Sequence, residues 1–255
     1  MQTDSVPILQ HNVTEQEWQM RVNLAACYRL IASYGWDDLV FTHISARVPD
    51  TEDEFLINPY GLLFEEITAS NLVKVNQAGE KVSPSEYDVN PAGFTIHSAV
   101  HEARSNAHCV LHLHTSDGVA VSTQKQGLLP ISQQSLFPLS NLAYHDYEGI
   151  ALNPEEKVRL VADLGSANFM ILRNHGLLTC ASSVADAFLY MYIMQKACEI
   201  QIKAQSSGNE LTLIPAHILA GIQAASDEVT KGANGDIAWP ALLRKLRRTD
   251  PSFEK

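Results

Sequence analysis

Residues 109–115 read Cys-Val-Leu-His-Leu-His-Thr, an apolar run interrupted by two histidines. Alternate side chains of a β-strand point to the same face, so a strand here places His112 and His114 side by side, one pleat apart. Two neighbouring imidazoles on one strand supply half of a divalent-metal site. A third candidate, His175, follows in the Arg-Asn-His-Gly-Leu-Leu stretch at 173–178. The pattern therefore predicts a strand that carries metal ligands.

Outward from this strand, helical and strand patterns alternate along the chain. Thr14 as N-cap and Glu17 at the capping-box position predict a helix that Gly35 ends. An acid-rich Asn153-Pro154 start predicts a second helix. Further helices are expected over 94–104, 183–205 and 214–230 and from Trp239-Pro240, with strands over 39–48, 55–57 and 170–173 and a hairpin over 72–82. This alternation predicts an α/β or α+β fold.

Composition narrows the class of protein. The chain has 255 residues and a net charge of −11, which argues against a nucleic-acid partner. The basic run at 243–248 is interpreted as the solvated face of a helix end. The four cysteines lie among apolar neighbours, which indicates buried thiols in a reducing compartment. We expect a cytoplasmic protein without a membrane partner, because no leader pattern and no membrane-length apolar run occurs.

Five stretches together resemble the class II aldolase/adducin head family, and the adducin-like branch most closely. They are Ile-Asn-Pro-Tyr-Gly-Leu-Leu at 57–63, Gly-Phe-Thr-Ile-His-Ser-Ala-Val at 93–100, His-Leu-His-Thr at 112–115, Tyr-His-Asp-Tyr-Glu-Gly at 144–149 and Leu-Arg-Asn-His-Gly-Leu at 172–177. The resemblance covers about 16–205. It implies a three-layer α/β/α sandwich with a mostly antiparallel central sheet, and a cyclic homotetramer with sites at subunit boundaries. We expect a single domain over 1–255, with a core of about 16–205 and a C-terminal helical extension over 206–255.

The resemblance also implies a cofactor. Enzymes of this family hold a divalent metal, usually zinc, with residues that match His112, His114 and His175. Three neutral imidazoles suit Zn²⁺ with an open coordination position, and they also suit Mn²⁺, Fe²⁺ or Co²⁺. Such a metal acts as a Lewis acid while a carbon–carbon bond breaks.

The chain departs from the aldolases at the positions that handle protons and phosphate. Their Ser-Ser-Glu stretch falls on Pro91, Ala92 and Gly93, and Glu86 lies seven residues too early to replace the acid. Their Gly-Asn pair becomes Thr42-His43, and their Thr-x-x-Gly turn becomes the Asn58–Gly61 turn. These departures argue against sugar-phosphate aldolase activity and for a small substrate without phosphate. The candidate substrate-binding residues are His43, Asn58, Gly61 and Gly93.

Two functions remain open. The first is a metal-dependent lyase that performs decarboxylation or retro-aldol cleavage on a small oxygenated acid or carbonyl compound, with its proton donor and acceptor unassigned. The second is an inactive adducin-head-like oligomerisation module with a structural or vestigial metal site. Actin or spectrin binding is not supported, because no long Lys-rich tail follows.

Several side chains carry weaker expectations. His43 could face the pocket or fill space, and His97 and His101 are interpreted as a packed helix face. Tyr144 and His145 lie in a family stretch whose loop could approach the metal, and Asp117 is expected to cap a helix.

Overall fold

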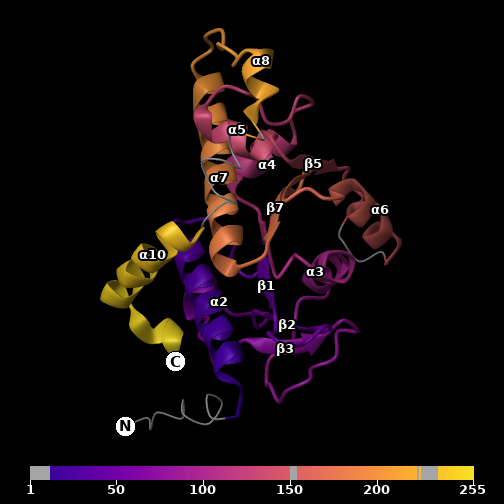
Figure 1. Ribbon diagram of the computed structural model, residues 1–255, viewed down its shortest axis with the longest axis vertical. Coiled ribbons are helices and arrows are strands. Elements are labelled where there is room, and N and C mark those ends of the chain that lie inside the picture. Colours follow the sequence, from indigo (N-terminus) through magenta and orange to yellow (C-terminus); the bar gives the residue numbers. More distant parts are fainter. Residues whose placement is uncertain (1–11, 150–153, 223, 225–234) are drawn as a thin grey trace.

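A seven-stranded sheet forms the centre of the molecule in the computed structural model, which describes residues 12–149, 154–222, 224 and 235–255 (Figure 1). Its strand order is β3-β2-β1-β4-β7-β6-β5. All neighbours pair antiparallel except β5 and β6, which confirms the expected mostly antiparallel sheet. The strands are β1 His43–Arg47, β2 Glu54–Ile57, β3 Val73–Asn76, β4 Cys109–Leu113, β5 Leu142–His145, β6 Phe169–Leu172 and β7 Gly176–Ala181.

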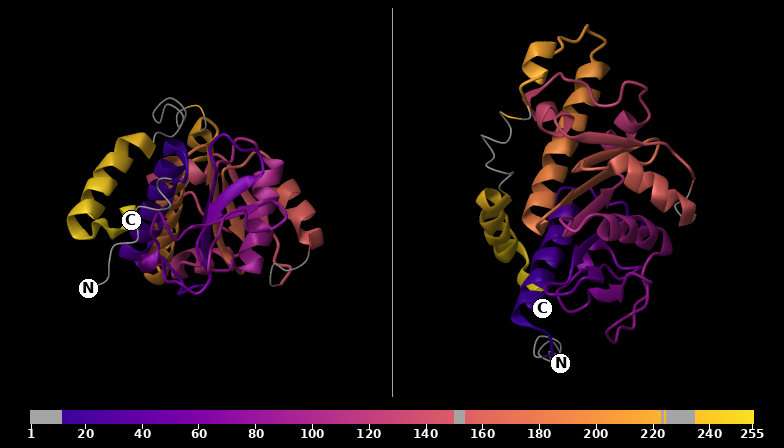
Figure 2. Two further views of the ribbon diagram at one scale, coloured as in Figure 1. Left: turned by 90° about the horizontal axis from the view of Figure 1, so that it is seen from below. Right: turned by 45° about the vertical axis from the view of Figure 1, so that its right-hand side comes forward.

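Helices cover both faces of this sheet (Figure 2). The long helices α2 and α7 pack on one face, and α3 and α6 pack on the other. The three-layer α/β/α sandwich is therefore confirmed. The helices are α2 Glu15–Ser33, α3 Pro91–Ala103, α4 Ser116–Ser122, α5 Gln133–Leu139, α6 Pro154–Leu164, α7 Val184–Ser206, α8 Ala216–Leu219 and α10 Gly235–Thr249, with short 3-10 helices η1 Phe64–Glu66 and η2 Pro251–Glu254.

The start of α2 shows how local sequence sets an element. The Thr14 hydroxyl accepts from the Glu17 backbone N–H at 3.1 Å, as expected of an N-cap. Glu17 does not complete the capping box, because its carboxylate is buried and pairs with Arg21 and Lys74, both at 2.9 Å. The buried Glu17 carboxylate is thus paired with two cations, one on α2 and one on β3.

Two expected elements differ from the structure. The strand expected over 39–48 forms only from His43, because Leu39 adopts a left-handed backbone with φ of 50° and is 61% exposed. In the hairpin expected over 72–82, β3 pairs with β2, and its return arm makes only an isolated bridge between Val75 and Lys81.

Two further expectations were wrong, one about the N-cap of a helix and one about where a helix starts. Thr115, and not Asp117, caps α4, because its hydroxyl accepts from the Gly118 N–H at 3.2 Å. The final helix begins at Gly235 and carries Pro240 inside it, so the expected start at Trp239-Pro240 is too late.

The remaining expectations concern the C-terminal part and the thiols. Of the helix expected over 214–230, α8 covers Ala216–Leu219, and most of the rest lies outside the described residues, as does Asn153. All four cysteines are buried and free, as expected. None of the helices in the described ranges is long and apolar enough to cross a membrane. The expected domain boundaries stay a prediction.

Candidate metal centre

Three neighbouring strands in the middle of the sheet bring four histidines together. His112 lies on β4 and His114 follows its end, so the two rings share the face that α3 covers. His43 on β1 is paired directly with His112 across the sheet. His175 occupies the turn between β6 and β7, where Asn174 adopts a left-handed backbone with φ of 57°.

The turn before β7 needs a glycine. A Cβ atom on Gly176 would lie 2.4 Å from the carbonyl oxygen of Leu113 and 3.2 Å from the His114 ring. Any larger residue would push β7 away from β4. The Gly176 backbone therefore allows His175 to lie against the His112-His114 pair.

The Nε2 atoms of three histidines converge on one point. His112 Nε2 lies 2.9 Å from His114 Nε2 and 3.2 Å from His175 Nε2. A tetrahedral zinc ion with Zn–N bonds of about 2.0–2.1 Å holds its nitrogens about 3.3 Å apart. The spacing of these three side chains fits a divalent cation, and they form the candidate metal group within the described residues.

The outer hydrogen bonds of two histidines fix which nitrogen carries a proton. His112 Nδ1 lies 3.1 Å from the Leu177 carbonyl oxygen, and His114 Nδ1 lies 3.0 Å from the Asp38 carboxylate. Carbonyl and carboxylate oxygens accept, so both Nδ1 atoms donate. In a neutral ring, Nε2 then carries a lone pair, and two lone pairs 2.9 Å apart cannot hydrogen-bond to each other. Such a donor set suits a cation.

Burial keeps the His112 and His175 rings neutral. Burial and then the neighbouring histidines hold the pKa of His112 well below its usual value. The same causes lower the pKa of His175 to about 4. A neutral imidazole is the form that binds a metal, so at pH 7 these two ligands need no proton removed.

A cavity of about 490 Å³ opens over this group. Its mouth carries exposed aromatic side chains, of which Phe41 is 50%, Tyr60 44% and Tyr147 54% exposed. Sequence analysis did not single out these side chains: Tyr60 and Tyr147 lie inside two of the family stretches without an assigned role, and Asp38 and Phe41 come from a loop without a periodic pattern. The lining consists of Asp38, Phe41, His43, Tyr60, Asn90, Ile96, His112, His114, Tyr147, Gly149 and His175.

The four candidate substrate-binding residues have different positions. His43 lines the cavity. Gly93 lies directly behind it, and a Cβ atom at position 93 would lie 2.4 Å from the Cδ2 atom of the His43 ring. The carboxylate expected there from the family pattern therefore has no room while His43 holds this place. Asn58 is buried and accepts from the Tyr28 hydroxyl at 2.9 Å, and neither it nor Gly61 lines the cavity.

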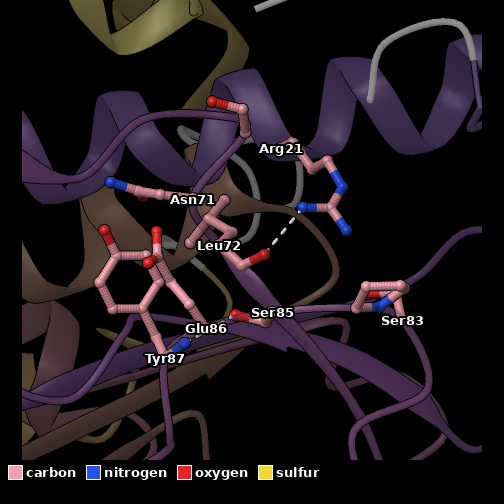
Figure 3. A pocket seen from close by; sticks show the side chains of 9 residues that line it. Arg21, Asn71, Leu72, Ser83, Ser85, Glu86 and Tyr87 are labelled. Atoms are coloured by element: carbon pink, nitrogen blue, oxygen red, sulfur yellow. Dashed lines mark hydrogen bonds between the residues drawn. The ribbon is translucent and has the colours of Figure 1, made fainter. Parts of the chain in front are cut away.

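Glu86 lines a different cavity, of about 600 Å³ (Figure 3). The figure shows it next to Tyr87, with Arg21 across the cavity donating to the Leu72 carbonyl oxygen. None of the candidate metal ligands lines this second cavity. Glu86 is therefore not placed to serve the histidine cavity.

The remaining candidates lie around the site. Tyr144 faces away from the histidines, and its hydroxyl accepts from the Leu128 N–H at 3.1 Å. His145 is buried and lies 2.7 Å from Asp163 through Nδ1. His97 and His101 pack against the sheet as expected, and both rings also hydrogen-bond to Ser45 on β1.

Known proteins with similar sequences identify the family of this chain. The family described as Class II Aldolase and Adducin N-terminal domain matches residues 22–202. A class 2 aldolase-type protein from Pseudomonas aeruginosa is 62% identical over 250 residues, covering 97% of this chain and 96% of its own length. Mouse alpha-adducin is 43% identical over 241 residues, which cover 89% of this chain and 33% of the adducin.

Solved structures agree with the sequence matches. An aldolase II superfamily protein from Pseudomonas syringae superposes with a TM-score of 0.93 at 50% identity, covering 97% of this chain and all of that one. The L-fuculose 1-phosphate aldolase of Glaciozyma antarctica superposes with a TM-score of 0.82 at 26% identity, covering 94% of this chain and 93% of that one. The chain therefore belongs to the class II aldolase and adducin N-terminal domain family.

Proposed function

We propose that this protein is a metal-dependent lyase that acts on a small oxygenated acid or carbonyl compound without phosphate. The observation that carries the proposal is the pair of lone-pair nitrogens on His112 and His114, 2.9 Å apart and within reach of His175. Family membership supports an aldolase-type reaction, and the solved L-fuculose 1-phosphate aldolase shares the fold. Zn²⁺ is the proposed metal, with Mn²⁺, Fe²⁺ or Co²⁺ as alternatives.

A divalent cation held there would polarise a substrate oxygen and stabilise the negative charge that develops as a carbon–carbon bond breaks. The chain's own residues set the conditions for this chemistry. Asp38 orients His114 through Nδ1, and the Leu177 carbonyl oxygen orients His112. Tyr147 and Tyr60 bring phenolic hydroxyls to the cavity as candidate proton donors.

The cavity supports a substrate without phosphate. No lysine or arginine lines it within the described part of the chain, whereas phosphate sites commonly use such side chains. Decarboxylation fits the loss of the family carboxylate, because carbon dioxide leaves without a base to remove a proton. A retro-aldol cleavage needs a base, for which His43 is placed at the cavity wall.

The exposed aromatic mouth supports assembly into a homotetramer. Phe41, Tyr60 and Tyr147 are between 44% and 54% exposed, and large exposed aromatic groups favour burial against a partner. A second copy seated there would complete the cavity at a subunit boundary.

The test is metal content followed by turnover. Protein purified without chelator or metal-affinity resin should hold about one metal per chain, and His112→Ala, His114→Ala and His175→Ala should each lose it. His108→Ala removes an exposed histidine and is the matched control. Full occupancy in His114→Ala would contradict the metal site.

Turnover then separates the two candidate functions. The metal-loaded protein should release carbon dioxide or an aldehyde from at least one member of a panel of hydroxy acids and oxo acids. The likeness to alpha-adducin favours the alternative of an oligomerisation module. A metal-loaded oligomer that is inert toward the whole panel would support that alternative.

A further inference from the structure

A buried chain of hydrogen bonds runs behind the cavity, between β1 and α3. His43 Nδ1 lies 2.8 Å from His97 Nε2, and His97 Nδ1 lies 2.6 Å from Ser45 Oγ. The same hydroxyl lies 2.7 Å from His101 Nε2, and His101 Nδ1 lies 2.9 Å from the Ala107 carbonyl oxygen. All four side chains are at most 3% exposed. The proposed function gives three of them, His97, Ser45 and His101, no role.

The contact between His101 and the Ala107 carbonyl oxygen determines where each proton lies in this series of hydrogen bonds. The Ala107 carbonyl oxygen can only accept, so His101 Nδ1 carries the proton and Nε2 accepts from the Ser45 hydroxyl. The Ser45 oxygen then accepts from His97 Nδ1, which leaves His97 Nε2 to accept from His43 Nδ1. In this neutral chain His43 Nε2 carries a lone pair.

This order of hydrogen bonds requires neutral histidine rings, and the buried surroundings of the rings favour that state. Burial lowers the pKa of His101 to about 3 and holds the pKa of His97 well below its usual value. These two rings therefore carry one proton each at neutral pH, which is the condition for a single direction of hydrogen bonding through Ser45.

The position of His43 connects this chain to the substrate. Its ring lines the cavity and lies beside the candidate metal ligand His112, with ring centroids 5.2 Å apart. No hydrogen-bond partner within the described residues takes Nε2. Gly93 leaves the space for the ring, since its Cβ atom would lie 2.7 Å from Nε2.

We propose that Ser45, His97 and His101 are positioning residues that hold His43 in its Nδ1-protonated tautomer, so that Nε2 is a fixed hydrogen-bond acceptor in the cavity. A fixed acceptor selects ligands with a donor, so within the proposed class of oxygenated acids and carbonyl compounds the substrate carries a free hydroxyl group near its metal-binding oxygens. This selection rests on the proposed function, whereas the tautomer does not depend on a metal.

The tautomers can be measured directly in metal-free protein. Long-range proton–nitrogen correlation spectra of histidine-labelled protein distinguish Nδ1–H from Nε2–H rings. We expect Nδ1–H on His43, His97 and His101. Ser45→Ala should release His43 into a mixture of tautomers, and Ser45→Thr, which keeps the hydroxyl, should preserve the wild-type pattern. An Nε2–H ring at His43 in the wild type, or an unchanged His43 in Ser45→Ala, would overturn the proposal.

Ligand selection is tested with glycolate and methoxyacetate, which share a carboxylate and a second oxygen but differ in the hydroxyl donor. Zinc-loaded wild type and Ser45→Thr should bind glycolate about tenfold more tightly than methoxyacetate, the effect of one hydrogen bond. In Ser45→Ala this ratio should fall in proportion to the fraction of His43 that keeps the Nδ1–H form, about twofold for an even mixture.

A ratio near one in the wild type would overturn the selection. If the tautomers are as derived but zinc is not retained and neither acid binds, the proposed function fails together with the selection, and the tautomer assignment stands. The two failures are therefore distinguishable.

Discussion

Replacing His101 by glutamine should change how the stability of the fold depends on pH. His101 is 2% exposed, and burial is the largest cause that lowers its pKa from 6.5 to about 3. Below pH 6.5 the unfolded chain binds a proton on this ring, whereas the folded chain binds it only near pH 3. The free energy of unfolding therefore falls as the pH falls through this window.

The size of the effect follows from the same two values. One unit of pKa difference corresponds to about 1.36 kcal/mol. Between pH 7.5 and pH 5, His101 thus costs the wild type about 2 kcal/mol of stability. His101→Gln removes this cost while keeping an acceptor for the Ser45 hydroxyl and a donor for the Ala107 carbonyl oxygen. At each pH the free energy of unfolding of His101→Gln is compared with that of the wild type. The loss of stability caused by the substitution should be about 2 kcal/mol smaller at pH 5 than at pH 7.5.

The assay is urea unfolding of metal-free protein, followed by tryptophan fluorescence at one protein concentration and at several pH values from 7.5 to 5. His217→Gln is the matched control, because this ring is exposed and is not among the groups that lower the pKa of His101. The free energy of unfolding of this control should depend on pH as that of the wild type does. A His101→Gln profile that is also parallel to the wild type would refute the argument that His101 is held neutral by burial.

Two further predictions concern the metal centre. Asp38→Asn removes the carboxylate 3.0 Å from His114 Nδ1 and should weaken zinc binding about 10–100-fold in competition with a chromophoric chelator; an unchanged affinity would contradict the orienting role of Asp38. Gly176→Ala places a Cβ atom 2.4 Å from the Leu113 carbonyl oxygen and should cost about 1–3 kcal/mol in urea unfolding. Gly221→Ala, whose Cβ atom meets nothing closer than 3.9 Å, is its control, and equal losses in the two variants would show that β7 does not need this close approach.

Local patterns predicted much of the fold because they depend on short-range geometry. The N-cap at Thr14, the helix after Ser183 and the strand that ends near His114 all follow from spacing and capping chemistry. The strand expected from Leu39 failed for a local reason as well, since a positive φ at Leu39 interrupts an apolar run that looks continuous in sequence. The short helix α8 likewise covers only part of a periodic stretch.

The candidate site was only partly predictable. The three candidate ligands match a family pattern, but that pattern did not show that Tyr60 and Tyr147 reach the cavity, and Asp38 lies in a loop that no period describes. Asn58, which the motif placed with the substrate, instead bonds to Tyr28 in the core. A sequence motif fixes the order of side chains, and it does not fix which of them a turn directs toward the cavity.

The sequence by itself determined that His112 and His114 share one face, because side chains of a strand alternate with a period of two. Only the tertiary structure decided which nitrogens of these rings are free. The Leu177 carbonyl oxygen and the Asp38 carboxylate fix the protons on the Nδ1 atoms of His112 and His114. Leu177 and Asp38 are far from these ligands along the chain, and each reaches its ring only once the strands have paired. A hydrogen bond between such distant segments fixes the proton on a ring, and no local pattern encodes it.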